Sequence, residues 1–160
     1  MAMSARDRHT LSASVFVALC RGDEVLLLRR TATGWMDGAF SLPAGGLEAG
    51  ETIAQAAIRE ALEEVGVHIA PADLVYVHTF HSLTEGRDWV GHVFTAARWD
   101  GTPRLMETGK HADLGWWPFE SLPPETIPYV RQALLNVSQA VAYSEYGWGG
   151  ARQDNALLEG

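Results

Sequence analysis

Residues 45–67 read GGLEAGETIAQAAIREALEEVGV, and this stretch decides how the rest of the chain is interpreted. Between residues 54 and 65 it contains neither Gly nor Pro and is rich in Ala, Leu and Glu, which predicts a helix. Thr52 followed by Gln55 is typical of a capping box and places the start of that helix. Gly66 stands where a helix commonly ends in a left-handed residue.

The predicted helix has an acidic face and an apolar face. At about 100° per residue, Glu60, Glu63 and Glu64 fall within an arc of roughly 100°. The opposite side carries apolar residues, namely Ala54, Ile58, Ala61, Leu62 and Val65. Like charges one turn apart destabilise a helix, so a bound divalent cation would explain why three carboxylates share one face. The alternative interpretation is a solvated acidic surface, which is the common fate of acidic runs.

The same stretch resembles the Nudix box. That pattern is Gly, five residues, Glu, seven residues, Arg-Glu, an apolar residue, any residue, Glu-Glu, any residue, Gly and an apolar residue. Every fixed position is matched here, by Gly45, Glu51, Arg59, Glu60, Ala61, Glu63, Glu64, Gly66 and Val67. Ala61 is smaller than the Leu, Ile or Val usual at its position. A pattern of this length at fixed spacing is far more specific than a short glycine motif.

The resemblance implies hydrolysis of a pyrophosphate bond in a nucleotide, with Mg²⁺ as the cofactor and Mn²⁺ as an alternative. Glu60 and Glu64 match the family's main metal ligands, and Glu63 matches a further ligand or the carboxylate that polarises the water. The backbone carbonyl that the family uses just before the box glycine falls on Ala44, and Glu48 in the following loop is an additional candidate ligand. Such cations cancel phosphate charge and help to deprotonate water.

The resemblance also assigns roles to the neighbours of these ligands. Arg59 and Glu51 match a pair that orients the ligands through charge-assisted contacts. Gly45, Glu51 and Gly66 are expected to have structural roles within the motif.

The identity of the general base stays open at this point. Many family members carry a carboxylate in the loop before the last strand, often where this chain has Gly109. Glu107 is the nearby carboxylate in this loop, and Glu63 is the alternative base. The residues expected to act in catalysis are therefore Glu63, Glu64, Arg59 and Glu107.

Substrate contacts are sought among aromatic and basic residues outside the box. Tyr76, His78 and Phe80 alternate along one predicted strand and share a face. We expect substrate to contact His78, Phe80, Trp116 and Arg29, with Trp35, Phe40, Trp89 and Phe94 as further stacking candidates. The alternative for each aromatic residue is a place in the core, which is the commoner role at strand spacing.

Length and composition restrict the class of protein. The 160 residues fit a single domain, and the net charge of −8 gives no electrostatic basis for binding duplex nucleic acid. A single cysteine, Cys20, favours a reducing compartment because it forms no internal disulfide. Without an apparent signal peptide or a bilayer-length apolar run, we expect a cytoplasmic protein with no membrane partner.

The remaining sequence predicts an α+β fold. Extended segments are expected at residues 11–20, 24–30, 39–42, 74–82, 89–99 and 115–118, and a second helix at 127–141. Residues 1–9 are expected to form a loose N-terminus, 105–115 a surface loop and 143–160 an irregular C-terminal tail. The similarity to Nudix domains implies an α/β/α sandwich with a mixed sheet over residues 10–142, as one Nudix domain.

Three functions fit these observations. The leading one is a Mg²⁺-dependent hydrolase of a nucleoside triphosphate or related small nucleotide. The alternatives are an ADP-ribose or nucleotide-sugar pyrophosphatase, and a non-catalytic nucleotide-binding regulator, which would usually lose box glutamates. A homodimer is a further expectation, because the aromatic residues at 143–148 offer a surface for a second subunit.

Overall fold

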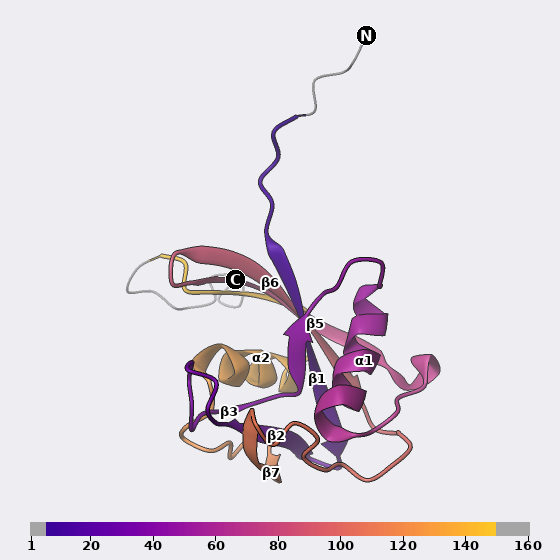
Figure 1. Cartoon of the computed structure of the whole chain (residues 1–160). Coiled ribbons are helices and arrows are strands. Elements are labelled where there is room, and N and C mark those ends of the chain that lie inside the picture. Colours follow the sequence, from indigo (N-terminus) through magenta and orange to yellow (C-terminus); the bar gives the residue numbers. More distant parts are fainter. Residues whose placement is uncertain (1–5, 150–160) are drawn as a thin grey trace.

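The structure is a computed structural model that describes residues 6–149 (Figure 1). The elements in chain order are β1 (Ser12–Arg21), β2 (Glu24–Arg30), β3 (Phe40–Ser41), β4 (Ala44–Gly46), α1 (Ile53–Val65), the 3₁₀ turn η1 (Pro71–Asp73), β5 (Val75–Thr84), β6 (Arg87–Ala96), β7 (His111–Pro118), α2 (Pro128–Ser138) and β8 (Tyr143–Tyr146). In the part of the chain that the structure describes, no helix has the length and apolar character needed to traverse a lipid bilayer.

Helix α1 begins and ends as its sequence predicts. The hydroxyl of Thr52 accepts a hydrogen bond from the backbone N–H of Gln55, and the Gln55 side chain accepts one from the backbone of Thr52, which completes the capping box. Gly66 has a φ of 71° and donates its N–H to the Leu62 carbonyl, which ends the helix.

Strand β1 is the centre of the sheet. It pairs antiparallel with β2 at only two positions and runs parallel to β6 along eight residues. The order through the mixed sheet is β3-β2-β1-β6-β5-β8, with β4 paired to β1 and β7 paired to β2. The two-position contact confirms the predicted hairpin and shows that β1 and β2 then separate into different parts of the sheet.

Two helices cover opposite faces of this sheet. Val15, Val17 and Leu19 of β1 are buried in a cluster that includes Ala56, Ala57, Ala61 and Val65 of α1. Ala54 and Leu62, which were predicted on the apolar side of this helix, are exposed. Phe16 and Ala18, which alternate with them, are buried in the cluster that includes α2. Figure 1 shows α1 and α2 on either side of β1. The predicted α/β/α sandwich with a mixed sheet is confirmed.

Two predicted segments are corrected by the structure. β7 begins at His111 rather than at Gly115, because residues 111–118 pair antiparallel with β2 along their length. Residues 143–146 form strand β8, parallel to β5, where the sequence suggested an irregular tail. Trp148 donates its indole N–H to the His81 carbonyl of the same chain. Residues 1–5 and 150–160, which belong to the predicted N-terminus and tail, lie outside the described residues.

Candidate active site

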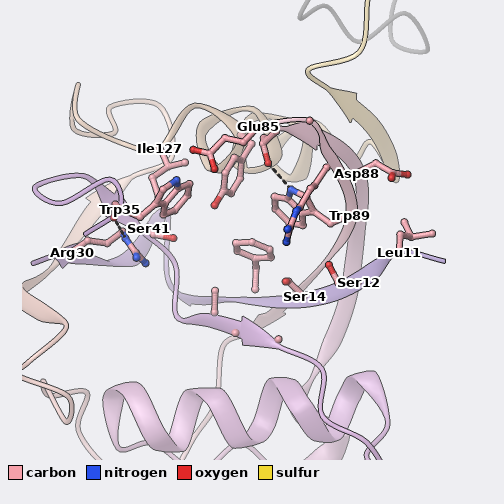
Figure 2. Close-up of a pocket in the computed structure, with 18 of the residues that line it drawn as sticks. Leu11, Ser12, Ser14, Arg30, Trp35, Ser41, Glu85, Asp88, Trp89 and Ile127 are labelled. Atoms are coloured by element: carbon pink, nitrogen blue, oxygen red, sulfur yellow. Dashed lines mark hydrogen bonds between the residues drawn. The ribbon is translucent and has the colours of Figure 1, made fainter. Parts of the chain in front are cut away.

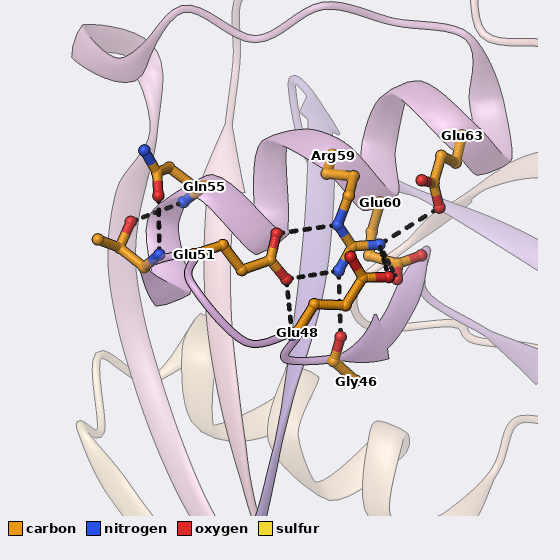
Figure 3. Close-up of polar contacts among 8 residues, drawn as sticks. Gly46, Glu48, Glu51, Gln55, Arg59, Glu60 and Glu63 are labelled. Carbon is orange, nitrogen blue, oxygen red and sulfur yellow. Dashed lines mark hydrogen bonds and ion pairs between the residues drawn. The ribbon is translucent and has the colours of Figure 1, made fainter.

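Arg59 organises the acidic face of α1. Its Nε and Nη2 donate to the two carboxylate oxygens of Glu51 at 2.9 and 2.7 Å, which is a bidentate pair. Its Nη1 donates to Glu60 Oε1 at 2.8 Å and its Nη2 to the Gly46 carbonyl at 3.1 Å. Figure 3 shows the guanidinium between the loop before α1 and the helix itself. The arginine therefore ties the loop, strand β4 and one candidate ligand together.

The charges of the Arg59–Glu51 pair stabilise each other. The Arg59 guanidinium, by hydrogen bonding, lowers the pKa of Glu51 to about 2. The same contact raises the pKa of Arg59. Both groups are therefore charged near neutral pH. Glu63 and Glu48 lie on the rim of this cluster, with ion-pair distances to Arg59 Nη1 of 3.3 and 3.7 Å.

Strand β4 presents a free edge to α1. Val17 N–H bonds the Pro43 carbonyl and Leu47 N–H bonds the Ala13 carbonyl, so the intervening Ala44 and Gly46 are the positions whose backbone points away from β1. The Ala44 N–H donates to Glu64 Oε2 at 3.0 Å. Because the N–H and C=O of one strand residue point to the same side, the Ala44 carbonyl also faces the carboxylates.

Gly45 is the position at which β4 and α1 approach most closely. A Cβ atom added to Gly45 would lie 1.9 Å from Glu60 Oε1, whereas one added to Gly46 would meet nothing within 4 Å. Only glycine therefore lets the Glu60 carboxylate pack against the strand. Glu60 and Glu64 are each only 8% exposed, although both carry ionisable groups. Helical spacing places these two glutamates on one face of α1, and in the structure that face packs against β4.

The two buried carboxylates make this a region that favours a cation. Burial is the main cause that raises the pKa of Glu64 to about 8; the charges of Glu60 and Glu107 contribute to this rise, and the Ala44 hydrogen bond opposes it. Burial also raises the pKa of Glu60, opposed by Arg59. Among residues 6–149 no group of three His, Cys, Asp or Glu side chains is arranged to hold an ion by itself. The residues therefore fit a hard cation bound by two carboxylates, with backbone and substrate oxygens completing its ligands.

Glu107 lies near this pair, as the loop position suggested. Its charge raises the pKa of both Glu60 and Glu64, and its Oε2 is 3.0 Å from Lys110 Nζ. Its carbonyl accepts the N–H groups of Lys110 and His111, which fixes the loop just before β7. The role of Glu107 as a general base stays a prediction.

A cavity of about 880 Å³ lies on the other side of β4 from α1 (Figure 2). Ala44, Gly45 and Gly46 form part of its wall, so the strand that contacts the carboxylates also borders the cavity. Its aromatic lining comes from segments far apart in the sequence, namely Phe16, Trp35, Trp89 and Tyr129. A ligand in this cavity would reach the acidic site along β4.

Two of the predicted substrate residues are buried, which corrects their assignment. His78 is fully buried, and its two ring nitrogens bond the Val141 carbonyl at 2.7 Å and the Ser144 hydroxyl at 2.8 Å. These bonds hold β8 against β5 and leave no ring nitrogen for a ligand. Phe80 is 1% exposed and packs between Phe16 and other core rings.

The other two predicted substrate residues lie away from the cavity. Trp116 stacks on Trp99 and lies under the Arg21 guanidinium. Arg29 donates to the Gly38 carbonyl and covers the ring of Phe40. The neighbouring Arg30 lines the cavity instead, because successive strand residues point to opposite faces. Tyr129 was missed, although it follows the proline at the start of the predicted second helix.

The family of the chain follows from this site and from comparison with known proteins. The family model of the NUDIX domain matches residues 9–136 of this chain. The chain belongs to the Nudix family. The solved structures of this family that it resembles include a MutT NUDIX hydrolase from Burkholderia pseudomallei, with a TM-score of 0.73 and 26% identity over 79% of this chain and 98% of that one. A NUDIX hydrolase from Nitrosomonas europaea has the same fold, with a TM-score of 0.69 and 22% identity over 84% and 93%.

Two curated Nudix-type relatives carry functional names. The human 8-oxo-dGDP phosphatase NUDT18 is 39% identical over 67% of this chain and 32% of its own length. The NAD-capped RNA hydrolase NudC of Pseudomonas aeruginosa is 35% identical over 71% of this chain and 38% of its own length. The match thus spans about a third of the length of each relative.

Proposed function

We propose that this Nudix chain is a Mg²⁺-dependent hydrolase that cleaves a pyrophosphate bond in a nucleoside triphosphate or a related small nucleotide. The observation that carries the proposal is the arrangement across β4. Two buried carboxylates, Glu60 and Glu64, pack on one side of this strand, and an aromatic cavity borders the other side. A nucleotide has the matching parts, because its base is apolar and planar and its phosphates attract cations.

The chain's own residues divide the work of hydrolysis. Glu60, Glu64 and the Ala44 carbonyl would hold the cation, which supplies charge neutralisation at the phosphate oxygens and a more acidic water. Arg59 holds Glu60 in position through its 2.8 Å hydrogen bond. Water oxygen attacks one phosphorus, the bond from that phosphorus to the bridging oxygen breaks, and the leaving phosphate departs with the bridging oxygen. Glu107, or Glu63 in its place, accepts the proton that the water loses.

The expected substrate follows from the size of the aromatic lining. We expect this cavity, with its four aromatic lining residues, to take one base, which favours a nucleoside triphosphate over a dinucleoside polyphosphate. The names of the relatives concern 8-oxo-dGDP and NAD-capped RNA, which also join a nucleoside to a diphosphate. A purely regulatory role is disfavoured because every glutamate of the box is present. We also propose the cytoplasm as the compartment, on the basis of the single cysteine.

A substrate panel tests this function. Nucleoside triphosphates, 8-oxo-dGDP, ADP-ribose, a nucleotide sugar and diadenosine polyphosphates are compared at equal concentration with Mg²⁺, by kcat/KM and product identification. The expected result is preference for a triphosphate, release of nucleoside monophosphate and pyrophosphate, and no turnover with EDTA. A tenfold preference for ADP-ribose or a nucleotide sugar would replace the proposed substrate, and an absence of turnover on every compound would overturn the enzymatic role.

A further inference from the structure

The loop at residues 31–38 presents an exposed aromatic ring to the cavity at a cost in backbone strain. Trp35 and Met36 are 37% and 40% exposed, and only Trp35 of the two lines the cavity. Ala32 and Met36 have φ values of 50° and 49°, a left-handed conformation that is unfavourable for residues other than glycine. Strain of this kind persists where the surrounding contacts enforce it, and it often marks a site of function.

Asp37 provides those contacts from within the loop. Its Oδ1 accepts the Thr33 N–H at 3.0 Å and the Thr33 hydroxyl at 2.6 Å, and its Oδ2 accepts the Gly34 N–H at 3.0 Å. These hydrogen bonds lower the pKa of Asp37, so the carboxylate is ionised at neutral pH. The loop is therefore ordered by its own hydrogen bonds although its side chains face solvent.

Arg30 fixes the Trp35 ring from the adjoining strand β2. Its Nε donates to the Trp35 carbonyl at 3.0 Å and its Nη2 to the Thr33 hydroxyl at 3.0 Å. Its guanidinium carbon lies 5.0 Å from the centroid of the Trp35 ring, which is cation–π geometry. Tyr129 is nearly parallel to Trp35, with an interplanar angle of 22° and a centroid distance of 6.4 Å. Arg30 therefore holds the indole at the cavity wall through its contacts with the Trp35 carbonyl and with one face of the ring (Figure 2).

The other cavity tryptophan is already engaged. Trp89 donates its indole N–H to the Thr84 hydroxyl and contacts the rings of Phe16, Phe80 and Tyr129. Trp35 contacts one aromatic ring within residues 6–149 and is more exposed. The free ring surface at this cavity therefore belongs mainly to Trp35.

We propose that Trp35 is a specificity-determining residue whose indole stacks on the nucleobase of the substrate. The proposal rests on the proposed function, since it assumes a nucleotide in the cavity. Ring surface that is already ordered costs little conformational entropy on binding, which is why a stiffened loop suits this role. Arg30 and Asp37 act as positioning residues, because their contacts reach the substrate only through the loop.

Binding of a non-hydrolysable nucleotide distinguishes the effect of the Trp35 ring from that of the loop as a whole. The Kd of an α,β-methylene nucleoside triphosphate is measured by calorimetry for the wild type and for Trp35→Ala, Trp35→Phe and Met36→Ala. Base–aromatic stacking is strong enough that Trp35→Ala is expected to raise the Kd about tenfold, with partial rescue by Trp35→Phe. Met36→Ala is the matched control, because it removes an equally exposed side chain from the same loop. Inorganic tripolyphosphate, which has no base, should bind the wild type and Trp35→Ala equally.

The outcomes distinguish this proposal from the enzymatic one. Equal nucleotide Kd values for Trp35→Ala and Met36→Ala would overturn the role of the ring, whatever the turnover. If Trp35→Ala raised the Kd of tripolyphosphate as much as that of the nucleotide, the proposal would also be overturned, because the substitution would then act on the phosphate site and not on the base. If the nucleotide binds as predicted and Mg²⁺ supports no hydrolysis, the stacking role stands and the proposed function fails. Each variant is checked by its melting temperature, so that unfolding is recognised.

Discussion

The two sides of β4 are built in different ways. The acidic side comes from one continuous stretch, since the bidentate pair, the candidate ligands and the close-packed glycine all lie between residues 44 and 64. The aromatic side is assembled from β1, the loop after β2, the start of β6 and the start of α2. Helical spacing alone brings the carboxylates together, whereas the cavity exists only after the sheet has formed. The difference predicts that damage to one side affects turnover and damage to the other affects binding.

The largest effect is expected from the buried carboxylates. Glu60→Gln and Glu64→Gln remove a charge from the cation site while keeping the shape of the side chain. We expect kcat to fall about a thousandfold, because charge neutralisation by a metal contributes several kcal/mol to the transition state. The melting temperature in the absence of metal should not fall, since burial opposes the ionised form of both groups. If both variants fold and keep the wild-type kcat, the acidic side does not hold the catalytic metal.

Arg59→Ala tests whether the acidic side acts as one ordered unit. Arg59 has no acceptor atom, so it orients ligands and does not bind the cation. We expect the Mg²⁺ concentration for half-maximal activity to rise by about 10- to 100-fold, as is typical when a ligand loses its hydrogen-bond partner. A Mg²⁺ titration measures this effect. An unchanged titration with full activity would contradict the orienting role, and Arg21→Ala, which removes an exposed arginine far from the motif, is the control.

Neighbouring glycines offer a matched pair on β4 itself. Gly45→Ala would place a methyl group 1.9 Å from Glu60 Oε1, while the methyl group of Gly46→Ala meets nothing within 4 Å. We expect Gly45→Ala to lower kcat/KM by about tenfold or more through displacement of Glu60, and Gly46→Ala to remain close to wild type. Equal effects of the two substitutions would show that Glu60 is not held against the strand.

Much of the acidic side could be predicted from the sequence because it depends on contacts between residues that are close in the chain. Thr52, Gln55 and Gly66 define the helix ends through short-range hydrogen bonds, and the positions of the glutamates then follow from the helical repeat. The close approach of Gly45 to Glu60 could not be derived in the same way, because it depends on the pairing of β4 with β1.

The aromatic side was predicted poorly for a physical reason. The alternation of residues 76, 78 and 80 predicted one shared strand face, and this is right for His78 and Phe80 only. A bulge between Tyr76 and His78 turns Tyr76 to the opposite face, where its hydroxyl contacts Thr79 and His92. Alternation also does not say whether a face meets solvent, a ligand or another element. In the structure His78 meets β8, whose pairing with β5 was not expected, and Phe80 meets the core. Trp35 and Trp89 were among the broader aromatic candidates, and only tertiary packing separates them from Phe40 and Phe94.

The smallest predicted effect concerns stability and lies outside both sides of β4. Burial lowers the pKa of His78 below its usual value of 6.5, so the unfolded chain binds a proton more readily than the folded one. Stability should therefore decrease as the pH falls below about 6.5, which is the usual histidine pKa. His78→Asn should weaken this dependence, although it also costs stability at neutral pH through lost contacts. Melting temperatures between pH 5 and 8 measure the effect, and identical pH slopes in the two proteins would contradict it.

The most direct test of the central claim is a kinetic cycle that joins the two sides of β4. Steady-state kcat and KM for the preferred nucleotide are measured for the wild type, Glu64→Gln, Trp35→Ala and the double variant at saturating Mg²⁺. We expect Glu64→Gln to lower kcat with little change in KM, Trp35→Ala to raise KM with little change in kcat, and the double variant to show both effects in full. A loss of kcat in Trp35→Ala as large as that in Glu64→Gln, or an intact kcat in Glu64→Gln, would contradict the central claim.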